Sequence, residues 1–329
     1  MPRPRFLPMS EIQEYTAVVP LDLAGRRLDQ AMASMFPDFS RSRLKLWILG
    51  GQALVDGSRR KPRDKVIGGE TICVRAEPEK QADAAPENID LDIVFEDASI
   101  IVLNKPAGLV VHPGAGNPRG TLMNALLHFR AGQADLPRAG IVHRLDKGTS
   151  GLMVVACSLQ AHTDLIRQIE RRNVHREYQA VCQGVLTAGG LVDQPIGRHP
   201  VDRLRMSVRE DGKEARTHYR VVKRYRAHTH MLAKLETGRT HQIRVHMAHI
   251  RHPLLGDPVY GGRRKIPAGA TEALRDMTAT FRRQALHASR LGFVHPESGE
   301  SIEFRAPLPP DMHQLLDVLK ADLKAGGGA

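Results

Sequence analysis

The feature that most constrains the fold is the order of strand-like and helical segments from Leu91 onward, because the two kinds do not alternate strictly. Strand-like runs occur in LDIVFEDASIIVLNKPAGLVVHPG, with turns at Asp97 and Pro106–Gly108, and then in EYQAVCQGVL, EARTHYRVVKRY and THMLAKLETG. Helical periodicity marks GTLMNALLHFRA, SLQAHTDLIRQIERR and LPPDMHQLLDVLKADLK. A doubly wound sheet requires regular alternation of strand and helix. We therefore expect an α+β domain with a mixed or antiparallel sheet over residues 91–324.

Outside this domain we expect four segments: a basic arm over 1–16, a compact unit over 17–76, a linker over 77–90 and a disordered tail over 325–329. In the compact unit, AGRRLDQAMASMFPDFSRSRLKLWILGG predicts two helices. Ser40 is the expected N-cap of the second helix, and Gly50–Gly51 the expected end. QALVDG and DKVIGGETICVRA predict short strands with turns at glycine.

Net charge is the compositional property that bears most on function. The chain has 48 Lys and Arg against 36 Asp and Glu, a formal net charge of +12. A chain this basic is attracted to a polyanion, either nucleic acid or an anionic membrane surface. No apolar stretch approaches the roughly 18 residues of a membrane-spanning helix, and the N-terminal residues lack the apolar region of a secretory signal. We therefore expect a nucleic acid partner, and the 3 widely spaced cysteines favour the reducing cytoplasm.

Basic residues are concentrated in the compact unit. Its second predicted helix carries Arg41, Arg43 and Lys45, and the loop GSRRKPRDK follows soon after. A solvated surface is the alternative explanation for such a run of charge. Because so many cations fall in one small unit, we expect a patch that binds RNA phosphates.

The segment GIVHRLDKGTSGLMVVA holds one acid, Asp146, between Arg144 and Lys147. An aspartate that caps a turn would explain the pattern without any function. The neighbouring cations favour the charged form of the carboxyl group, however, and a surface built only to bind phosphates gains nothing from an anion. An ionised carboxylate here suits chemistry at an electrophilic sugar carbon. A serine nucleophile is not supported, because the elbow motif needs glycine two residues after the serine and Leu152 stands there.

Four histidines in THQIRVHMAHIRHP raise the alternative of a metal site: His241, His246, His249 and His252. No cysteine lies nearby, and we expect a strand-to-loop placement whose spacing is not specific for a metal. Histidines in a basic protein more often bond to the backbone or to phosphate, so we expect no metal.

Several long segments together identify a resemblance to a known family. HRLDKGTSGLMVVA, HREYQAVCQG, LETGRTHQIRVHMAHIRHPLLGDPVYGG and QALHASRLGFVHP, with LNKPAGLVVHPG upstream, resemble the RluA-type pseudouridine synthases. The likeness is greatest to the branch that modifies large-subunit ribosomal RNA. Residues 17–75 resemble an S4 RNA-binding domain, so the resemblance covers nearly the whole chain. It implies a mixed sheet with a central cleft, in agreement with the pattern of elements.

The resemblance also implies roles for individual residues. Asp146 matches the catalytic aspartate, Tyr178 the tyrosine that packs on the target base, and Arg244 the basic residue that pairs with the aspartate. Arg144 matches the arginine that enters the RNA stack in place of the extruded uridine. Further RNA contacts are expected from the loop PIGRHPVDRLRMSV, from the segment GRTH and from the S4-like unit, through Arg198, Arg203, Arg239, His241, Arg41, Arg43 and Lys45.

The implied reaction breaks the bond from ribose C1′ to uracil N1, turns the base and joins C1′ to C5. No redox change occurs, so no cofactor is expected. Asp146 could attack C1′, add to the ring or remove the C2′ proton, and the sequence leaves these three open. Glu177 is the candidate for a second acid, but next to Tyr178 on a strand it should face the opposite side.

Two other functions compete with this reaction. One is a non-catalytic RNA-binding factor for ribosome assembly on the same scaffold, and the other is a nucleoside hydrolase that releases free uracil. The expected enzyme is a cytoplasmic monomer that acts on large-subunit ribosomal RNA, within a pre-ribosomal particle.

Overall fold

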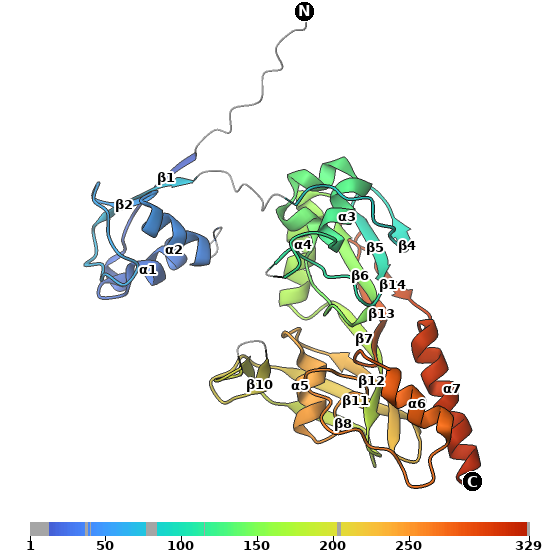
Figure 1. Cartoon of the computed structure of the whole chain (residues 1–329). Coiled ribbons are helices and arrows are strands. Elements are labelled where there is room, and N and C mark those ends of the chain that lie inside the picture. Colours follow the sequence, from blue (N-terminus) through green and yellow to red (C-terminus); the bar gives the residue numbers. More distant parts are fainter. Residues whose placement is uncertain are drawn as a thin grey trace, which may run out of the picture. The chain divides into compact units, whose positions relative to one another are not determined.

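The computed structural model describes residues 13–36, 39, 41–76, 84–114, 116–202 and 205–327. The chain forms two compact units, Met1–Ala82 and Asp83–Ala329 (Figure 1). The expected N-cap Ser40 and the expected RNA-binding residue Arg203 lie outside the described residues, as do the side chains of Arg41 and Arg43.

The first unit packs two helices on a three-stranded antiparallel sheet of order β1-β3-β2. Its elements are β1 (Gln13–Val18), α1 (Leu28–Met35), α2 (Arg41–Gly50), β2 (Ala53–Val55) and β3 (Thr71–Ala76). The apolar residues at helical spacing, among them Leu28, Met32, Leu44 and Trp47, form its core. The arm predicted over 1–16 is wrong at its end, because Gln13–Thr16 pair with β3 and Tyr15 packs against this core.

A mixed sheet of nine strands runs through the second unit. In the order β4-β5-β6-β13-β7-β12-β11-β8, every pair is antiparallel except β6 with β13, and β14 pairs with β13. The strands are β4 (Ile93–Glu96), β5 (Ile100–Lys105), β6 (Ser150–Ala156), β7 (His175–Gln183), β8 (Gly190–Asp193), β11 (Arg216–Arg224), β12 (His228–Leu235), β13 (Leu286–Val294) and β14 (Ser301–Arg305). β9 (Ile196–Arg198) and β10 (Met206–Val208) form a separate pair. The predicted α+β fold with a mixed or antiparallel sheet is confirmed.

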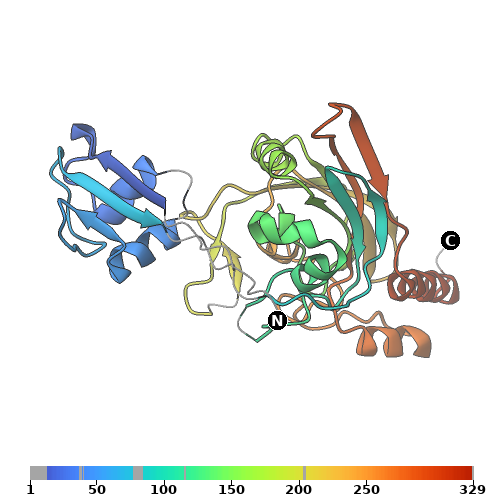
Figure 2. The same ribbon diagram turned by 90° about the horizontal axis from the view of Figure 1, so that it is seen from above.

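Helices cover both faces of this sheet. Successive side chains of a strand point to opposite faces, so neighbouring residues of β7 pack into different cores. Tyr178 and Ala180 of β7 pack in one core with α3 and α5, whereas Val181 packs in another with α6 and α7. α6 and α7 lie side by side (Figures 1 and 2). The helices are α3 (Leu122–Phe129), α4 (Leu159–Glu170), α5 (Gln242–His249), α6 (Glu272–Thr280) and α7 (Pro310–Ala325). α7 thus includes the first residue of the predicted tail.

Gly151 permits the one parallel contact of the sheet. β13 runs beside β6 through two pairs, His287 with Ser150 and Ala288 with Gly151. Gly151 has a φ of 117°, and a Cβ there would lie 2.3 Å from the carbonyl oxygen of Ala288. A side chain therefore fits neither the backbone conformation nor the space. Gly151 of GTSGL therefore allows β6 to pair with β13. Its neighbour Ser150 is buried against His287, with the Ser150 Oγ 2.9 Å from Nδ1 of the histidine.

Two predicted segments differ in the structure. Residues 84–90, expected in the linker, belong to the second unit, where the Asn124 side chain donates to the Ala85 carbonyl at 2.8 Å. The segment THQIRVHMAHIRHP contains helix α5 instead of the expected strand-to-loop placement. All side chains of Gln242–Met247 are buried, so the helix has no polar stripe to reveal its period in the sequence.

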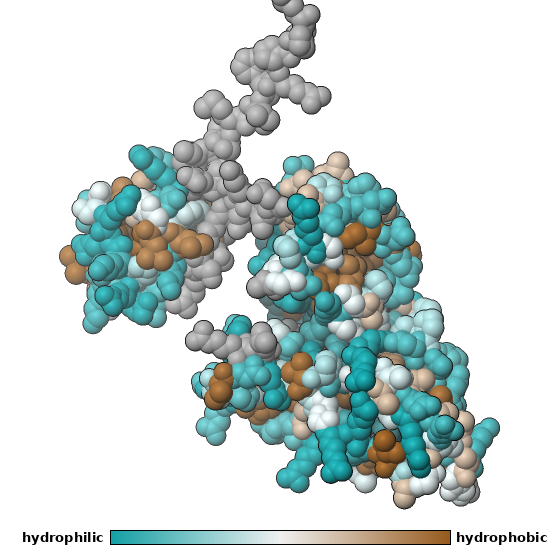
Figure 3. Space-filling view, in the orientation of Figure 1, coloured by the Kyte–Doolittle hydropathy of each residue, from teal (hydrophilic) through white to brown (hydrophobic). Residues whose placement is uncertain are grey.

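The surface seen in Figure 3 is mostly hydrophilic, and its apolar side chains fall in small separate patches. Within the described residues, no helix combines the length and the apolar character needed to cross a membrane.

Candidate active site

The loop that carries Asp146 lies between the turn Pro137–Gly140, in which Arg138 and Ala139 have positive φ values, and β6. The Thr149 N–H donates to the Asp146 carbonyl at 3.0 Å and closes a tight turn. The Gly108 N–H donates to the Lys147 carbonyl at 2.7 Å. These contacts fix the backbone around Asp146, whose side chain remains 19% exposed.

A buried lysine also supports this loop. Lys105, the last residue of β5, is fully buried, and its Nζ donates to the carbonyls of Pro106 at 2.8 Å, Leu109 at 2.9 Å and Lys147 at 3.5 Å. Burial lowers the pKa of Lys105 to about 7, although the charge of Asp146 acts in the opposite direction. Lys105 thus ties the turn after β5 to the Asp146 loop.

The carboxylate of Asp146 faces a guanidinium from α5. Nη1 of Arg244 donates to Oδ2 of Asp146 at 2.9 Å, while Nε and Nη2 donate to Oδ2 and Oδ1 of Asp257 at 2.7 and 2.9 Å. Oδ1 of Asp257 also accepts the backbone N–H groups of Val259 and Tyr260. Asp257 therefore holds one edge of the guanidinium, and the other edge is presented to Asp146.

The ion pair between Arg244 and Asp257 offsets the cost of burying their two charges. Arg244 is 4% exposed and Asp257 is 6% exposed. Burial opposes ionisation of Asp257, but the hydrogen bonds from Arg244 and from two backbone N–H groups outweigh it, and its pKa lies below the ordinary value. Burial likewise opposes the charge of Arg244, but its bonds to Asp257 and the nearby Asp146 hold its pKa above the ordinary value. Arg244 and Asp257 therefore stay ionised at neutral pH.

Tyr260 connects this ion pair to its surroundings. Its hydroxyl lies 2.8 Å from Nδ1 of His241 and accepts the Met206 N–H at 2.8 Å, while the Arg244 guanidinium lies 5.0 Å from its ring centre. Nε2 of His241 lies 3.9 Å from Oδ1 of Asp146. Burial lowers the pKa of His241, although Asp146 opposes this effect.

A cavity of about 540 Å³ opens between the Asp146 loop, β7 and the start of α5. Tyr178 lies in its wall on the face of β7 that packs toward α5, and it is 6% exposed. Burial raises the pKa of the Tyr178 phenol, and the charges of Arg176 and Asp146 act on it in opposite directions. The arginines of the cavity wall are Arg138, Arg144, Arg172, Arg176, Arg239 and Arg244. The cavity thus brings a carboxylate and an aromatic ring into a strongly cationic environment.

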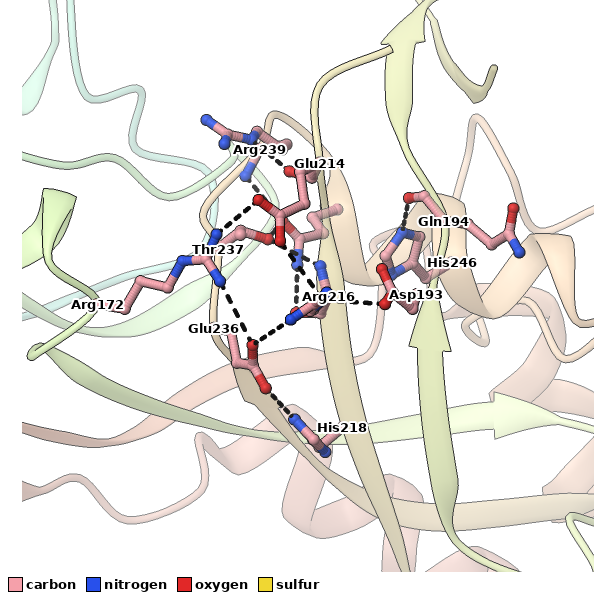
Figure 4. A network of polar contacts seen from close by, with 11 residues as sticks. Arg172, Asp193, Gln194, Glu214, Arg216, His218, Glu236, Thr237, Arg239 and His246 are labelled. Atoms are coloured by element: carbon pink, nitrogen blue, oxygen red, sulfur yellow. Dashed lines mark hydrogen bonds and ion pairs between the residues drawn. The ribbon is translucent and has the colours of Figure 1, made fainter. Parts of the chain in front are cut away.

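A polar network, shown in part in Figure 4, anchors the start of α5 to β11 and to the end of β12. Gln242 donates to the Thr217 hydroxyl at 3.0 Å and accepts a hydrogen bond from the Thr237 hydroxyl at 2.8 Å. Nδ1 of His246 bonds to the same Thr217 hydroxyl at 2.9 Å. Because Arg244 lies between Gln242 and His246, the network sets the direction in which α5 presents its guanidinium.

Comparison with known proteins assigns the family. The family model described as RNA pseudouridylate synthase matches residues 99–249. Ribosomal large subunit pseudouridine synthase D of Escherichia coli O157:H7 is 56% identical over 317 residues, which cover 96% of this chain and 97% of that protein. This chain belongs to the RNA pseudouridine synthase family. The synthase D of Xanthomonas campestris pv. campestris is 56% identical over 306 residues, 93% of this chain and 92% of that protein.

Solved structures of pseudouridine synthases show the same fold. Human RNA Pseudouridylate Synthase Domain Containing 4 has a TM-score of 0.54 and 25% identity, and the match covers 70% of this chain and 93% of that one. Human RNA Pseudouridylate Synthase Domain Containing 1 also has a TM-score of 0.54 and 25% identity, over 71% of this chain and 96% of that one. The predicted membership of the pseudouridine synthase family is confirmed, whereas the S4 assignment of the first unit stays a prediction.

The synthase brings most of the predicted site residues to one cavity, whose wall contains Asp146, Tyr178, Arg244, Arg144, Arg239 and His241. Arg144 is exposed there, and Nε of Arg239 donates to the Glu214 carbonyl at 2.9 Å. Arg198 is exposed at the end of β9 and is not part of the wall, and the exposed Lys45 belongs to the first unit. The roles of these residues toward RNA stay predictions.

Three of the four histidines in the α5 segment have separate hydrogen-bond partners, and His249 is exposed. His241 bonds to Tyr260, His246 bonds to Thr217, and Nδ1 of His252 lies 3.0 Å from the Gln183 carbonyl. Across the described part of the chain, no group of three or more His, Cys, Asp and Glu side chains is placed to hold a metal ion.

The second acid considered from the sequence does not reach the cavity. Glu177 is absent from the cavity wall, and it pairs across the sheet with Arg290, whose charge it supports. Its neighbour Tyr178 faces the opposite side, as the alternation of a strand requires.

Asp257 and Tyr260 are the site residues that the sequence analysis missed. Both lie in GDPVYGG, where Gly256 has a φ of 74° and a Cβ would lie 2.2 Å from the Arg283 carbonyl oxygen. This turn brings the carboxylate back to α5. The sequence does show a turn-forming glycine, Gly256, directly before Asp257. Nothing in the sequence, however, indicates that Asp257 contacts Arg244.

Proposed function

We propose that this synthase isomerises uridine to pseudouridine in large-subunit ribosomal RNA, with Asp146 as its catalytic residue. The observation that carries the proposal is the 2.9 Å contact between Asp146 and Arg244 in a cavity that Tyr178 also lines. The names of the relatives from Escherichia coli and Xanthomonas campestris support the ribosomal substrate.

The carboxylate of Asp146 acts on the ribose or on the base of the bound uridine. The bond from C1′ to N1 breaks, the bond from C1′ to C5 forms, and the proton lost from C5 is balanced by the proton gained at N1. Attack at C1′, addition to the ring and removal of the C2′ proton all require an ionised carboxylate. Arg244, itself fixed by Asp257, supports that charge and orients the carboxylate. Arg244 is thus a positioning residue.

The uridine must leave the RNA stack before it can reach Asp146, at a cost of a few kcal/mol. Tyr178 offers an aromatic surface to the extruded base, and such stacking contributes about 1–3 kcal/mol per base. Arg144 is exposed in the cavity wall, where it can hold a phosphate or fill the gap left in the stack. A detached base that stays held against Tyr178 returns to C1′ in preference to hydrolysis.

The rest of the chain supplies affinity for the RNA. A net charge of +12 favours contact with phosphates, and the first unit presents an exposed Lys45 and the basic loop GSRRKPRDK. We assign the enzyme to the cytoplasm, where it acts as a monomer on a pre-ribosomal particle. Its cysteines Cys73, Cys157 and Cys182 are free, in keeping with a reducing compartment.

The test is conversion of uridine in transcripts of large-subunit ribosomal RNA by the wild type, Asp146→Asn and the control Asp135→Asn. Asp135 is exposed, and it does not line the cavity. We expect pseudouridine from the wild type and the control, and none from Asp146→Asn although it still binds RNA. Binding without conversion by the wild type would indicate an assembly factor, and release of free uracil would indicate a hydrolase.

A further inference from the structure

Arg176 is a buried arginine that the mechanism above does not use. It lies on β7 two residues before Tyr178, on the same face of the strand, at about 6.6 Å along the strand. It is 7% exposed and lines the cavity with Asp146. Its Nε is buried and has no hydrogen-bond partner among the described residues.

Two acids of the cavity wall, Asp146 and Glu236, have other partners. Asp146 accepts from Arg244. Glu236 contacts three other side chains, which Figure 4 shows: His218 at 2.5 Å, Arg172 at 3.7 Å and Arg216 at 3.8 Å. Within the described residues, no carboxylate forms an ion pair with Arg176.

The chain makes room for this guanidinium. A Cβ at Gly238 would lie 2.6 Å from Nη1 of Arg176, so the absence of a side chain at position 238 lets the guanidinium lie against the backbone that follows β12. A buried charge without a partner is costly, and a guanidinium is only a donor of hydrogen bonds. A guanidinium nitrogen in this position suits an acceptor oxygen that enters with the substrate.

We propose that Arg176 binds the carbonyl oxygen of the extruded uracil that points away from ribose C1′. The inference rests on the proposed function, in which Tyr178 stacks on that base and Asp146 faces the sugar. In uridine, the ring position opposite N1 is C4, so the oxygen that points away from C1′ is O4.

The same contact serves the product. Isomerisation turns the ring about the line through N3 and C6, which exchanges N1 with C5 and C4 with C2. O2 then occupies the place that O4 had, and Arg176 donates to it in turn. One fixed donor thus holds the base before and after the rotation.

The contact also separates uridine from cytidine. Cytidine carries an amino group at C4. Because this amino group and the guanidinium of Arg176 are both donors, no hydrogen bond forms between them. A phosphate is the other oxygen that an arginine binds, but the exposed Arg144 of the same cavity is better placed for one than the buried Arg176.

The experiment compares two RNAs that differ only at one converted position, mapped beforehand with the wild-type enzyme, where one RNA carries uridine and the other cytidine. Binding is measured in an Asp146→Asn background, alone and with Arg176→Met, Arg176→Lys or Gly238→Ala. Gly238→Ala keeps the charge of Arg176 but displaces its guanidinium. It therefore tests the position of the guanidinium without removing the arginine. Arg220→Met is the matched control, because Arg220 is exposed on β11 and does not line the cavity.

We expect Arg176→Met and Gly238→Ala to weaken binding of the uridine RNA by ~10- to 100-fold, the value of a hydrogen bond to a charged donor, and to leave the cytidine RNA unchanged. Arg176→Lys should give a smaller loss, and the control none. If both RNAs weaken equally and the salt dependence falls, Arg176 binds a phosphate and the inference is wrong. Unchanged discrimination in Gly238→Ala, or in a folded Arg176→Met, also overturns it. Failure of the proposed function shows itself earlier, as a wild type that converts no uridine.

Discussion

Replacing Asp257 by asparagine tests whether the active site depends on a buried acid that reaches Asp146 only through Arg244. An asparagine oxygen in the place of Oδ1 can keep the bonds from Nη2 of Arg244 and from the backbone of Val259 and Tyr260. Its amide nitrogen then faces the Nε–H that now donates to Oδ2 at 2.7 Å. One charge-assisted bond, worth about 1.5–3 kcal/mol, is lost, and two donors face each other.

The expected loss of stability is about 3 kcal/mol. Breaking a buried ion pair costs about 3–5 kcal/mol, and the lower end applies because Arg244 keeps its 2.9 Å contact with Asp146. We also expect the single-turnover rate to fall about 100-fold, equivalent to about 2.7 kcal/mol of barrier, because Arg244 no longer orients the catalytic carboxylate.

The pH dependence follows from the lowered pKa of Asp257. Its contribution to stability is complete above the unfolded value of about 3.9 and is lost as the pH falls through the lower folded value. The difference in unfolding free energy between the wild type and Asp257→Asn should therefore be constant from about pH 5 to 7, and should shrink below about pH 4.

Urea unfolding followed by far-UV circular dichroism measures the stability change. The one tryptophan, Trp47, lies in the first unit, so its fluorescence separately checks that this unit is unaffected. Asp276→Asn, on the exposed side of α6, is the matched control. A variant within 0.5 kcal/mol of the wild type, with an unchanged rate, would refute the reasoning, since ordinary surface substitutions fall within about that range.

Three further substitutions probe the loop, the sheet and the base-binding surface. Lys105→Met should lower stability by ~1–3 kcal/mol in urea melts, because the carbonyls lose their donor. The pKa of Lys105 is lowered to about 7, so between about pH 7 and 10.4 the unfolded state binds more protons than the folded state. The stability of the wild type relative to the variant should therefore rise over that range. Gly151→Ala should cost more than ~3 kcal/mol in the same melts, because its Cβ would meet the Ala288 carbonyl oxygen at 2.3 Å. Tyr178→Leu in an Asp146→Asn background should weaken RNA binding by ~10- to 100-fold in a titration, whereas Tyr178→Phe keeps the ring and should bind as before.

The sequence was informative where a pattern has a local cause. The helical spacing of Leu44, Trp47 and Ile48 marks the buried face of α2, and alternation along β7 places Tyr178 and Glu177 on opposite sides. Long motifs with an internal order then supplied the family, because many residues had to match together.

The sequence was uninformative where tertiary contact decides the structure. Helix α5 is buried nearly all round, so its residues lack the polar stripe on which a helix prediction depends. The bond between Asp257 and Arg244 is formed by a turn at Gly256, and Arg176 becomes unusual only when the partners of Glu236 are known. Such pairings follow from how the elements pack, not from any local pattern.

The two-residue parallel contact between β6 and β13 has a consequence for how activity is acquired. In the strand order, β4, β5 and β6 pair with the remaining strands only there. Asp146 lies in the loop before β6, whereas Tyr178 lies on β7 and Arg244 on α5, on the other side of that contact. The hairpins β4–β5, β11–β12 and β13–β14 form from neighbouring segments, but Asp146 and Arg244 meet only after the two parts dock. During renaturation, catalytic turnover should therefore return later than strand content, and enzymatic competence reports the last step of assembly.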